Sequence, residues 1–157
     1  MKKNRRQFLI DGTTVFTLLG LGFFPACGSA IGKGKAWQQS WFESGKNLEE
    51  TFAALGVRKP IVDQKIVLKA PDTAENGAYV GINIESSIPN IDAVAFLVDK
   101  NPIVLSGYFE IKRLEKLKLG TKIKMAETSD LIALVKAGDN YFMNTRHVKV
   151  VLGGCGS

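Results

Sequence analysis

Apolar and polar residues alternate with a period of two through most of the chain after Lys59-Pro60. This period places successive side chains on opposite faces of an extended strand, so it predicts strands with one buried face. The runs that show it most clearly are Val80, Ile82 and Ile84; Val94, Phe96 and Val98; and Ile103, Leu105, Phe109 and Ile111. Turn residues separate these runs at short intervals, which favours a sandwich of antiparallel sheets over alternating strands and helices.

Further strands and turns are expected along the same stretch. The strands are expected at 66–68, 122–125, 131–137 and 141–152, and the turns at 75–77, 89–90, 100–102, 120–121 and 138–140. In the last strand, Val148 and Val150 should share a face with Leu152, while His147 points to the other face. Residues 114–119 fit either a helix or an extended strand.

One short helix is expected ahead of the strands. Asn47 is a favourable N-cap with Glu50 three residues later, and Gly56 is a typical residue for a helix end. The apolar residues on one face of this helix are Leu48, Phe52 and Leu55. Together with the strands, the helix predicts one mainly β domain over residues 47–152, which is enough chain for a single core.

The first 30 residues have the composition of a targeting segment, with a basic start, an apolar run at 15–24 and small residues before Ala30. The apolar run is shorter than the roughly 20 residues that a membrane-spanning helix needs. Export to the periplasm with cleavage after Ala30 is therefore expected, leaving no membrane segment. Residues 4–9 (Asn-Arg-Arg-Gln-Phe-Leu) resemble a twin-arginine signal, although Asn4 replaces the usual Ser or Thr. A general secretory signal is the alternative.

Residues 31–46 are expected to form a mobile lead-in, because they begin with Gly and Lys residues and show no periodicity. Trp37, Trp41 and Phe42 lie in this stretch. They are expected to pack under the helix, with contact to a partner as the alternative.

The formal charge of +6 is concentrated at the start of the chain. Over residues 31–157 there are 17 Lys and Arg against 14 Asp and Glu, a net charge of +3 that is spread along the sequence. This distribution argues against a nucleic-acid binder, whose basic residues would cluster.

Removal of the targeting segment would leave one cysteine. Cys27 lies inside that segment, so Cys155 would be the only thiol of the mature chain. A lone cysteine in an oxidising compartment indicates a functional thiol or a mixed disulfide. Two alternatives stay open: a Cys27–Cys155 bridge in an uncleaved chain, and cleavage before Cys27 with lipidation there.

The last expected strand is followed by Gly-Gly-Cys-Gly-Ser, residues 153–157. Glycine samples the widest backbone space, so Gly153, Gly154 and Gly156 would leave the Cys155 thiol on a flexible arm. Five extended residues reach about 17 Å, enough to enter a deep pocket on another protein. The segment therefore favours a carrier that holds a covalent adduct on Cys155, a role in binding and delivery rather than catalysis.

No catalytic, metal or cofactor site is predicted. His147, the only histidine, stands eight residues before Cys155, a distance of about 26 Å along an extended chain, and is expected on the surface. Met125, Met143, His147 and Cys155 lack the spacing of metal ligands. A thiol oxidoreductase would carry a Cys-x-x-Cys pair or a resolving cysteine, which the mature chain lacks. The remaining alternative is a sandwich protein whose Cys155 forms an intermolecular disulfide.

Four segments resemble the SoxY family, the sulfur-carrier subunits of the periplasmic Sox thiosulfate-oxidation system. They are Ala74-Glu75-Asn76-Gly77-Ala78, Lys100-Asn101-Pro102, residues 122–129 (Lys-Ile-Lys-Met-Ala-Glu-Thr-Ser), and residues 148–156 with the Gly-Gly-Cys-Gly motif. The chain departs from the family at Ser157, where glycine is usual.

The resemblance implies an immunoglobulin-like antiparallel β-sandwich that pairs with a second small sandwich subunit, SoxZ. It also implies that Cys155 is the attachment site. A cytochrome pair, SoxAX, would join thiosulfate to Cys155; SoxB would hydrolyse off sulfate; and SoxCD, where present, would oxidise the remaining sulfane sulfur. The carrier itself would supply no redox cofactor and no catalytic residue.

Overall fold

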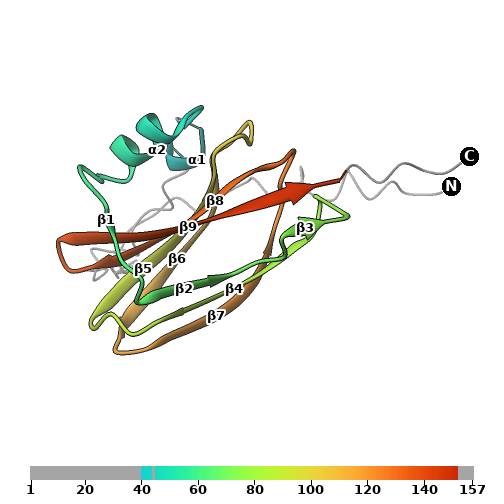
Figure 1. Ribbon diagram of the computed structural model, residues 1–157. Coiled ribbons are helices and arrows are strands. Elements are labelled where there is room, and N and C mark those ends of the chain that lie inside the picture. The colour runs from blue at the N-terminus through green and yellow to red at the C-terminus, as the bar shows by residue number, and fades with distance from the viewer. Residues whose placement is uncertain (1–39, 44, 152–157) are drawn as a thin grey trace, which may run out of the picture. The chain divides into compact units, whose positions relative to one another are not determined.

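The computed structural model describes residues 40–43 and 45–151, which form two helices and nine strands (Figure 1). The helices are α1 (Ser40–Glu43) and α2 (Leu48–Ala54). The strands are β1 (Ile61–Val62), β2 (Ile66–Lys69), β3 (Thr73–Ala74), β4 (Val80–Ser86), β5 (Ile91–Val98), β6 (Leu105–Leu114), β7 (Leu117–Ile123), β8 (Ser129–Ala137) and β9 (Asn140–Val150). Within this part of the chain, neither helix is long and apolar enough to span a bilayer. The expected targeting segment 1–30 lies outside the described residues.

The strands form two sheets that pack face to face. The larger sheet has the order β1-β9-β8-β5-β6, with β3 also paired to β9, and the smaller sheet has the order β2-β4-β7. Neighbouring strands run antiparallel, except that β1 and β3, each two residues long, run parallel to β9. The expected immunoglobulin-like β-sandwich with a short N-terminal helix is therefore confirmed.

The space between the sheets is filled by residues that the alternating pattern predicted to be buried. Those contributed by β4 and β5 are Val80, Ile82 and Ile84, and Val94, Phe96 and Val98. Burying an aliphatic or aromatic side chain of this size stabilises the fold by roughly 1.5–3 kcal/mol. The period of two thus identified the core between the sheets correctly.

The central strands of the larger sheet are buried on both faces. Leu97 of β5 and Leu134 of β8 point away from the smaller sheet and pack with Leu55, which follows α2. We call this second group of buried residues the helix-side cluster. At its margin, the Trp41 ring of α1 meets the Tyr108 ring of β6 edge to face, with centroids 4.9 Å apart. Burial of the Tyr108 side chain raises the pKa of its hydroxyl.

The predicted helix is confirmed as α2. The Asn47 side chain accepts a hydrogen bond from the Glu50 amide at 2.8 Å, and Gly56, with φ of 73°, adopts the left-handed conformation that ends a helix. Residues 40–43, which fall in the expected lead-in 31–46, form α1, and their aromatic residues pack in the helix-side cluster.

β6 departs from the single face that was expected for its apolar residues. Adjacent residues of β5 pair with Gly107 and Leu105, so Ser106 is an extra residue in β6. A bulge of this kind reverses the alternation of side chains. Leu105 therefore packs in the helix-side cluster, whereas Phe109 packs between the sheets. Ile103 precedes the strand and is exposed.

The β6–β7 region also differs from the sequence expectation. The undecided residues 114–119 are extended and lie at the ends of β6 and β7. The turn expected at 120–121 is wrong, because both residues lie inside β7, and the strand expected at 122–125 overlaps only the end of β7. Gly120 pairs with Asn83, whose side-chain oxygen would lie 2.7 Å from a Cβ at position 120. This glycine makes room for a neighbouring side chain and not for a turn.

Candidate functional site

The predicted attachment site and its arm lie outside the described residues. These positions are Cys155, Gly153, Gly154 and Gly156. The structure instead describes the strand that leads to them, which ends at Val150. Val148 is fully buried and Val150 is partly buried, as their shared face predicts. Leu152, expected on the same face, is also outside the described residues.

The last described residues of β9 are hydrogen-bonded on both sides. On one side, the Val151 amide donates to the Ala74 carbonyl at 2.9 Å and so extends the pairing with β3, which lies beside the end of β9 (Figure 1). On the other side, the Val150 amide donates to Thr128 Oγ1 at 3.0 Å, and this hydroxyl donates to the Val150 carbonyl at 3.4 Å. These bonds fix the backbone just before the cysteine-bearing segment.

Two loops meet at this end of β9: residues 75–78 after β3, and residues 124–128 between β7 and β8. The Met125 amide donates to the Gly77 carbonyl at 2.7 Å. A Cβ at position 77 would overlap the Met125 carbonyl oxygen and would lie 2.9 Å from Val150 Cγ1. Only glycine permits this close approach of the two loops.

Asn101 holds the second loop from its other side. Its Nδ2 donates to the Lys124 carbonyl at 2.7 Å, and its Oδ1 accepts from the Ala126 amide at 2.8 Å. The side chain thus bonds both backbone groups in the way that a neighbouring strand would. The turn that contains Asn101 and the loop that contains Lys124 are therefore fixed to each other.

Two open hollows lie beside these loops. The first, which we call the exit hollow, has a volume of about 460 Å³ and is lined by residues 75–78, 124–126, 150 and 151. The second, which we call the loop hollow, has a volume of about 410 Å³ and is lined by residues 42, 101–103, 105, 106, 124 and 126. Because both are lined by Lys124 and Ala126, they are neighbouring parts of one surface.

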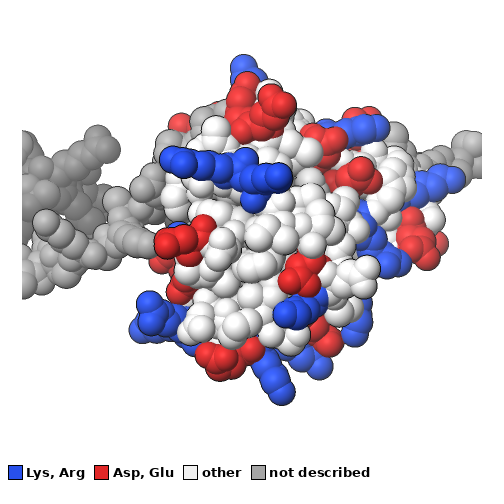
Figure 2. All heavy atoms as spheres, turned by 60° about the vertical axis from the view of Figure 1, so that its left-hand side comes forward, with Lys and Arg blue, Asp and Glu red and all other residues white. Residues whose placement is uncertain are grey.

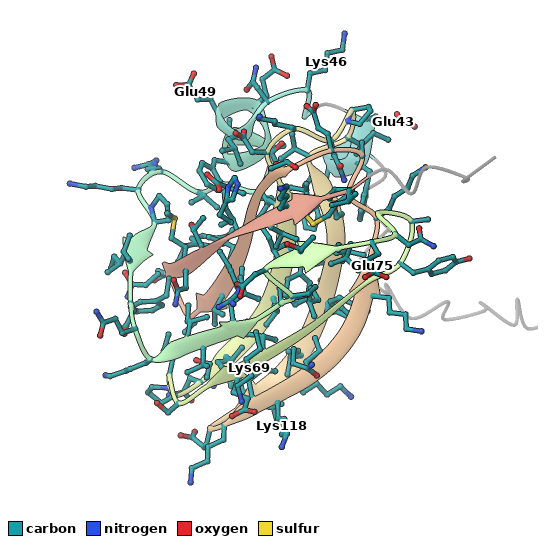
Figure 3. All side chains as sticks on the ribbon, turned by 45° about the vertical axis from the view of Figure 1, so that its right-hand side comes forward. Glu43, Lys46, Glu49, Lys69, Glu75 and Lys118 are labelled. Carbon is teal, nitrogen blue, oxygen red and sulfur yellow. The ribbon has the colours of Figure 1, made fainter. Side chains whose placement is uncertain are left out.

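One basic and one acidic side chain line the exit hollow. On the face that Figure 2 shows, which is the side away from the end of β9 in Figure 1, basic and acidic side chains are interspersed and neither sign dominates. Lys124 is the basic residue of both hollows; its side chain is exposed and forms no ion pair with any described residue. Glu75, on the loop after β3, is the acidic residue of the exit hollow (Figure 3).

His147 lies apart from the two hollows. It is exposed on β9 opposite Asp130 of β8, and its Nδ1 is 2.7 Å from Asp130 Oδ1. The neighbouring residue Arg146 forms an ion pair of 2.7 Å with Asp72. None of these residues lines the exit hollow or the loop hollow.

The two methionines considered as metal ligands lie in different parts of the core. Met125 is buried between the sheets, whereas Met143 packs in the helix-side cluster. Among residues 40–43 and 45–151, no group of three or more His, Cys, Asp and Glu side chains could hold a metal ion.

The sequence did not predict how these segments meet. Residues 75–78, 100–102 and 124–128 and the end of β9 lie together at one end of the sandwich, although long stretches of chain separate them. One signal was present in the sequence: the segments that meet here are the ones that carry the family resemblance. Their contacts depend on side-chain and backbone bonds between distant loops, which local patterns do not encode.

Comparison with known proteins identifies the family. The family model described as "Sulfur oxidation protein SoxY" matches residues 52–155. Among solved structures, the sulfur carrier protein SoxY from Chlorobium limicola f thiosulfatophilum is 30% identical, with a TM-score of 0.60 over 68% of this chain and 97% of that chain. No match was found among curated proteins. The matched segment includes both loops of the exit hollow and the strand beside them, and on this evidence the chain belongs to the SoxY family of sulfur oxidation proteins.

Proposed function

We propose that this protein is a covalent carrier of sulfur intermediates derived from thiosulfate, and that Cys155 is the attachment site. The observation that carries the proposal is that the family match extends to residue 155 while the backbone before it is fixed at Val150 and Val151. The related Chlorobium protein is itself described as a sulfur carrier. A fixed base followed by a glycine-rich segment is the arrangement that a carrier requires.

The proposed arm consists of Gly153, Gly154 and Gly156 around the attachment cysteine. Cys155 stands four residues after Val151, so an extended arm carries the sulfur about 13 Å from the body of the protein. Glycines permit the arm to turn in any direction. The arm would therefore enter the pockets of several enzymes while the sandwich stays outside them.

Loading of the carrier is an oxidation. Formation of the sulfur–sulfur bond between Cys155 and thiosulfate releases the thiol proton and two electrons. The two electrons pass to a cytochrome partner of the SoxAX type, and the proton passes to solvent. Hydrolysis by a SoxB-type enzyme then adds water, releases sulfate and leaves a persulfide on Cys155. The carrier supplies the sulfur atom and its position, and the partner enzymes supply the catalysis.

We further propose that the protein works in the periplasm after export by the twin-arginine route. There it would pair with a SoxZ-like subunit and meet SoxAX, SoxB and, where present, SoxCD. Replacing Arg5 and Arg6 with lysine tests the export route, because accumulation of uncleaved precursor in the cytoplasm is expected. Normal export of that variant would indicate a general secretory signal.

Mass spectrometry of the intact mature protein, isolated after growth on thiosulfate, tests the carrier role. We expect mass increments that correspond to thiosulfonate or sulfane sulfur, that disappear with reductant and that map to Cys155. Cys155→Ser should fold normally and carry none of them. A disulfide-linked dimer as the sole modified form would instead support the alternative, a sandwich protein joined through its thiols.

A further inference from the structure

We propose that the outer face of β7 is a docking surface for an acidic surface on an enzyme that receives the arm. The docking surface consists of Lys118 and Lys122 on β7 and of Lys116 and Lys124, which flank the strand, and we call it the basic strip. This inference rests on the proposed carrier function. It adds to that function the place where a partner enzyme contacts the body of the carrier.

The net charge of +3 over residues 31–157 conceals a local excess. Residues 112–124 hold six Lys and Arg and one Glu, a net charge of +5. The other positions of 31–157 hold 11 Lys and Arg against 13 Asp and Glu, a net charge of −2. The positive charge is therefore concentrated on the end of β6 and on β7, and is less evenly spread than the whole-chain count suggested. A concentrated charge of this kind attracts an oppositely charged surface.

The lysines of the basic strip are exposed along one strand. Leu117 and Ile123 of β7 are buried between the sheets. Because side chains alternate along a strand, Lys118 and Lys122 point outward, and all four lysines of the strip are exposed. From residue 116 to residue 124 an extended chain spans about 26 Å, comparable with the width of a protein interface of ordinary size.

The charges of the basic strip are not neutralised within the part of the chain that the structure describes. None of the ion pairs there includes a lysine of the strip. Glu85 lies opposite Lys118 in the register of β4 and β7, but its carboxylate accepts a hydrogen bond from Lys69 (Figure 3). Like charges along one strand repel one another, and the binding of an acidic surface relieves this repulsion.

The composition of the surface fits a protein partner better than a nucleic acid. All four charges belong to lysine, which lacks the planar fork with which arginine grips a phosphate. Residues 116–124 contain no aromatic residue on which a base could stack. The sheet surface beside the lysines is flat, because Gly81 and Gly120 have no side chain. A flat, lysine-rich surface suits a broad contact with an acidic protein.

The basic strip ends beside the base of the proposed arm. Lys124, at the end of the strip, and Val151, the last described residue, line the same hollow. An enzyme docked on the strip would therefore have the start of the arm at one edge of the contact. Cys155 can extend about 13 Å beyond Val151, which allows it to enter an active site of the docked enzyme.

Charge reversal tests the inference on the mature protein paired with its SoxZ-like subunit. Cys155→Ser is present throughout, so that binding is measured without covalent chemistry, and the probes are the purified SoxAX-type and SoxB-type enzymes. Lys118→Glu combined with Lys122→Glu should weaken binding of at least one enzyme by about tenfold or more at about 20 mM salt, and the difference should shrink at about 500 mM salt.

A second double variant is the matched control. Lys59→Glu combined with Lys65→Glu makes the same change in net charge at exposed positions before β1 and before β2. This control should leave enzyme binding nearly unchanged. Equal effects of the two double variants, binding that does not depend on salt, or no binding of either enzyme would overturn the inference. Salt-dependent binding of a DNA oligonucleotide without binding of an enzyme would also overturn it.

Folding and subunit pairing are checked by circular dichroism and by co-purification with the SoxZ-like subunit. Loss of pairing in the strip variant alone would overturn the inference, because the strip would then be the subunit interface. If the reversed variant does not fold, Lys118→Gln combined with Lys122→Gln should weaken binding in the same direction. Aggregation of this variant with unchanged enzyme binding would mean that the lysines only protect an edge strand, and would overturn the docking surface.

The outcome is separable from that of the proposed function. Adducts found on Cys155 in cells, together with equal binding by the strip and control variants, would leave the carrier role intact and remove the docking surface. Salt-dependent binding of an enzyme at the strip, together with no adducts in cells, would leave the docking surface intact and remove the carrier role.

Discussion

The two ends of β9 are held in different ways. Near its start, Tyr141 and Met143 pack in the helix-side cluster, and the Tyr141 hydroxyl donates to the Leu55 carbonyl at 2.9 Å. Near its end, Val148 and Val150 face the core between the sheets, and hydrogen bonds to Ala74 and Thr128 fix the backbone beside the exit hollow. Packing stabilises by filling space, whereas hydrogen bonds fix the backbone and leave the surface open. The end that precedes Cys155 is thus positioned without being covered.

Leu97→Ala should have the largest effect on stability. It removes packing from the helix-side cluster, which holds the start of β9. Leu97 is fully buried in the helix-side cluster, so the truncation leaves a cavity and lowers the free energy of unfolding by about 2–5 kcal/mol. Urea denaturation measures the loss. Hydrogen exchange at the Val150 amide below the unfolding transition should change little. A loss under about 1 kcal/mol would mean that the helices contribute little packing.

Gly77→Ala tests the other end. A Cβ at this position would collide with the loop that contains Met125, so the two loops must move apart, and we expect a loss of about 1–3 kcal/mol. Gly81→Ala is the matched control, because a Cβ there would meet nothing within 4 Å. Thermal denaturation compares the two variants. Equal changes in Tm would show that the loops are not closely apposed.

Thr128→Val sharpens the comparison further. It removes the hydroxyl that bonds both the amide and the carbonyl of Val150, at a cost of about 1 kcal/mol. The main expected result is faster hydrogen exchange of the Val150 amide, measured by NMR. Thr145→Val serves as the control, because Thr145 is an exposed residue of β9, the strand that also contains Val150. This variant should leave the exchange rate of the Val150 amide unchanged.

Glu85→Gln should have the smallest effect, since the Glu85 side chain is 40% exposed on the smaller sheet and lines neither hollow. A hydrogen bond from Lys69 at 3.1 Å lowers the pKa of Glu85, and Lys118, on the neighbouring strand, adds a smaller effect (Figure 3). A lowered carboxyl pKa stabilises the folded state above the unfolded pKa, and this contribution is lost as pH falls through the folded value. Tm measured between about pH 3 and 7 should differ slightly between wild type and variant at neutral pH and converge in acid. High salt should remove the difference.

The alternating pattern predicted the inter-sheet core because burial of one strand face leaves a direct mark on the sequence. Val80, Ile82 and Ile84 are an example, and α2 followed equally well from its cap at Asn47. The bulge at Ser106 left no such mark, since it arises from the register between two strands. Gly120 was misread as a turn residue because the reason for it lies on another strand, at Asn83.

The candidate site was only half predictable for the same reason. Cys155 and its glycines stand together in the sequence, so the proposal for their chemistry came from the sequence alone; it stays a prediction, because they lie outside the described residues. The arrangement of the loops beside the end of β9 depends on Asn101 and Gly77, which meet the Met125 loop only in the folded protein. No local pattern distinguishes these two residues from ordinary turn residues.

The pairing of β9 also determines how the protein responds to force. If Cys155 is the attachment site proposed above, an enzyme that holds it would pull on the end of β9, which is paired with β8 from Asn140 to Val148 and with β3 at its end. Because the bonds between antiparallel strands lie perpendicular to them, such a pull loads the whole row in shear, and the bonds cannot open one after another. The sandwich would therefore resist a pulling force applied at the end of β9.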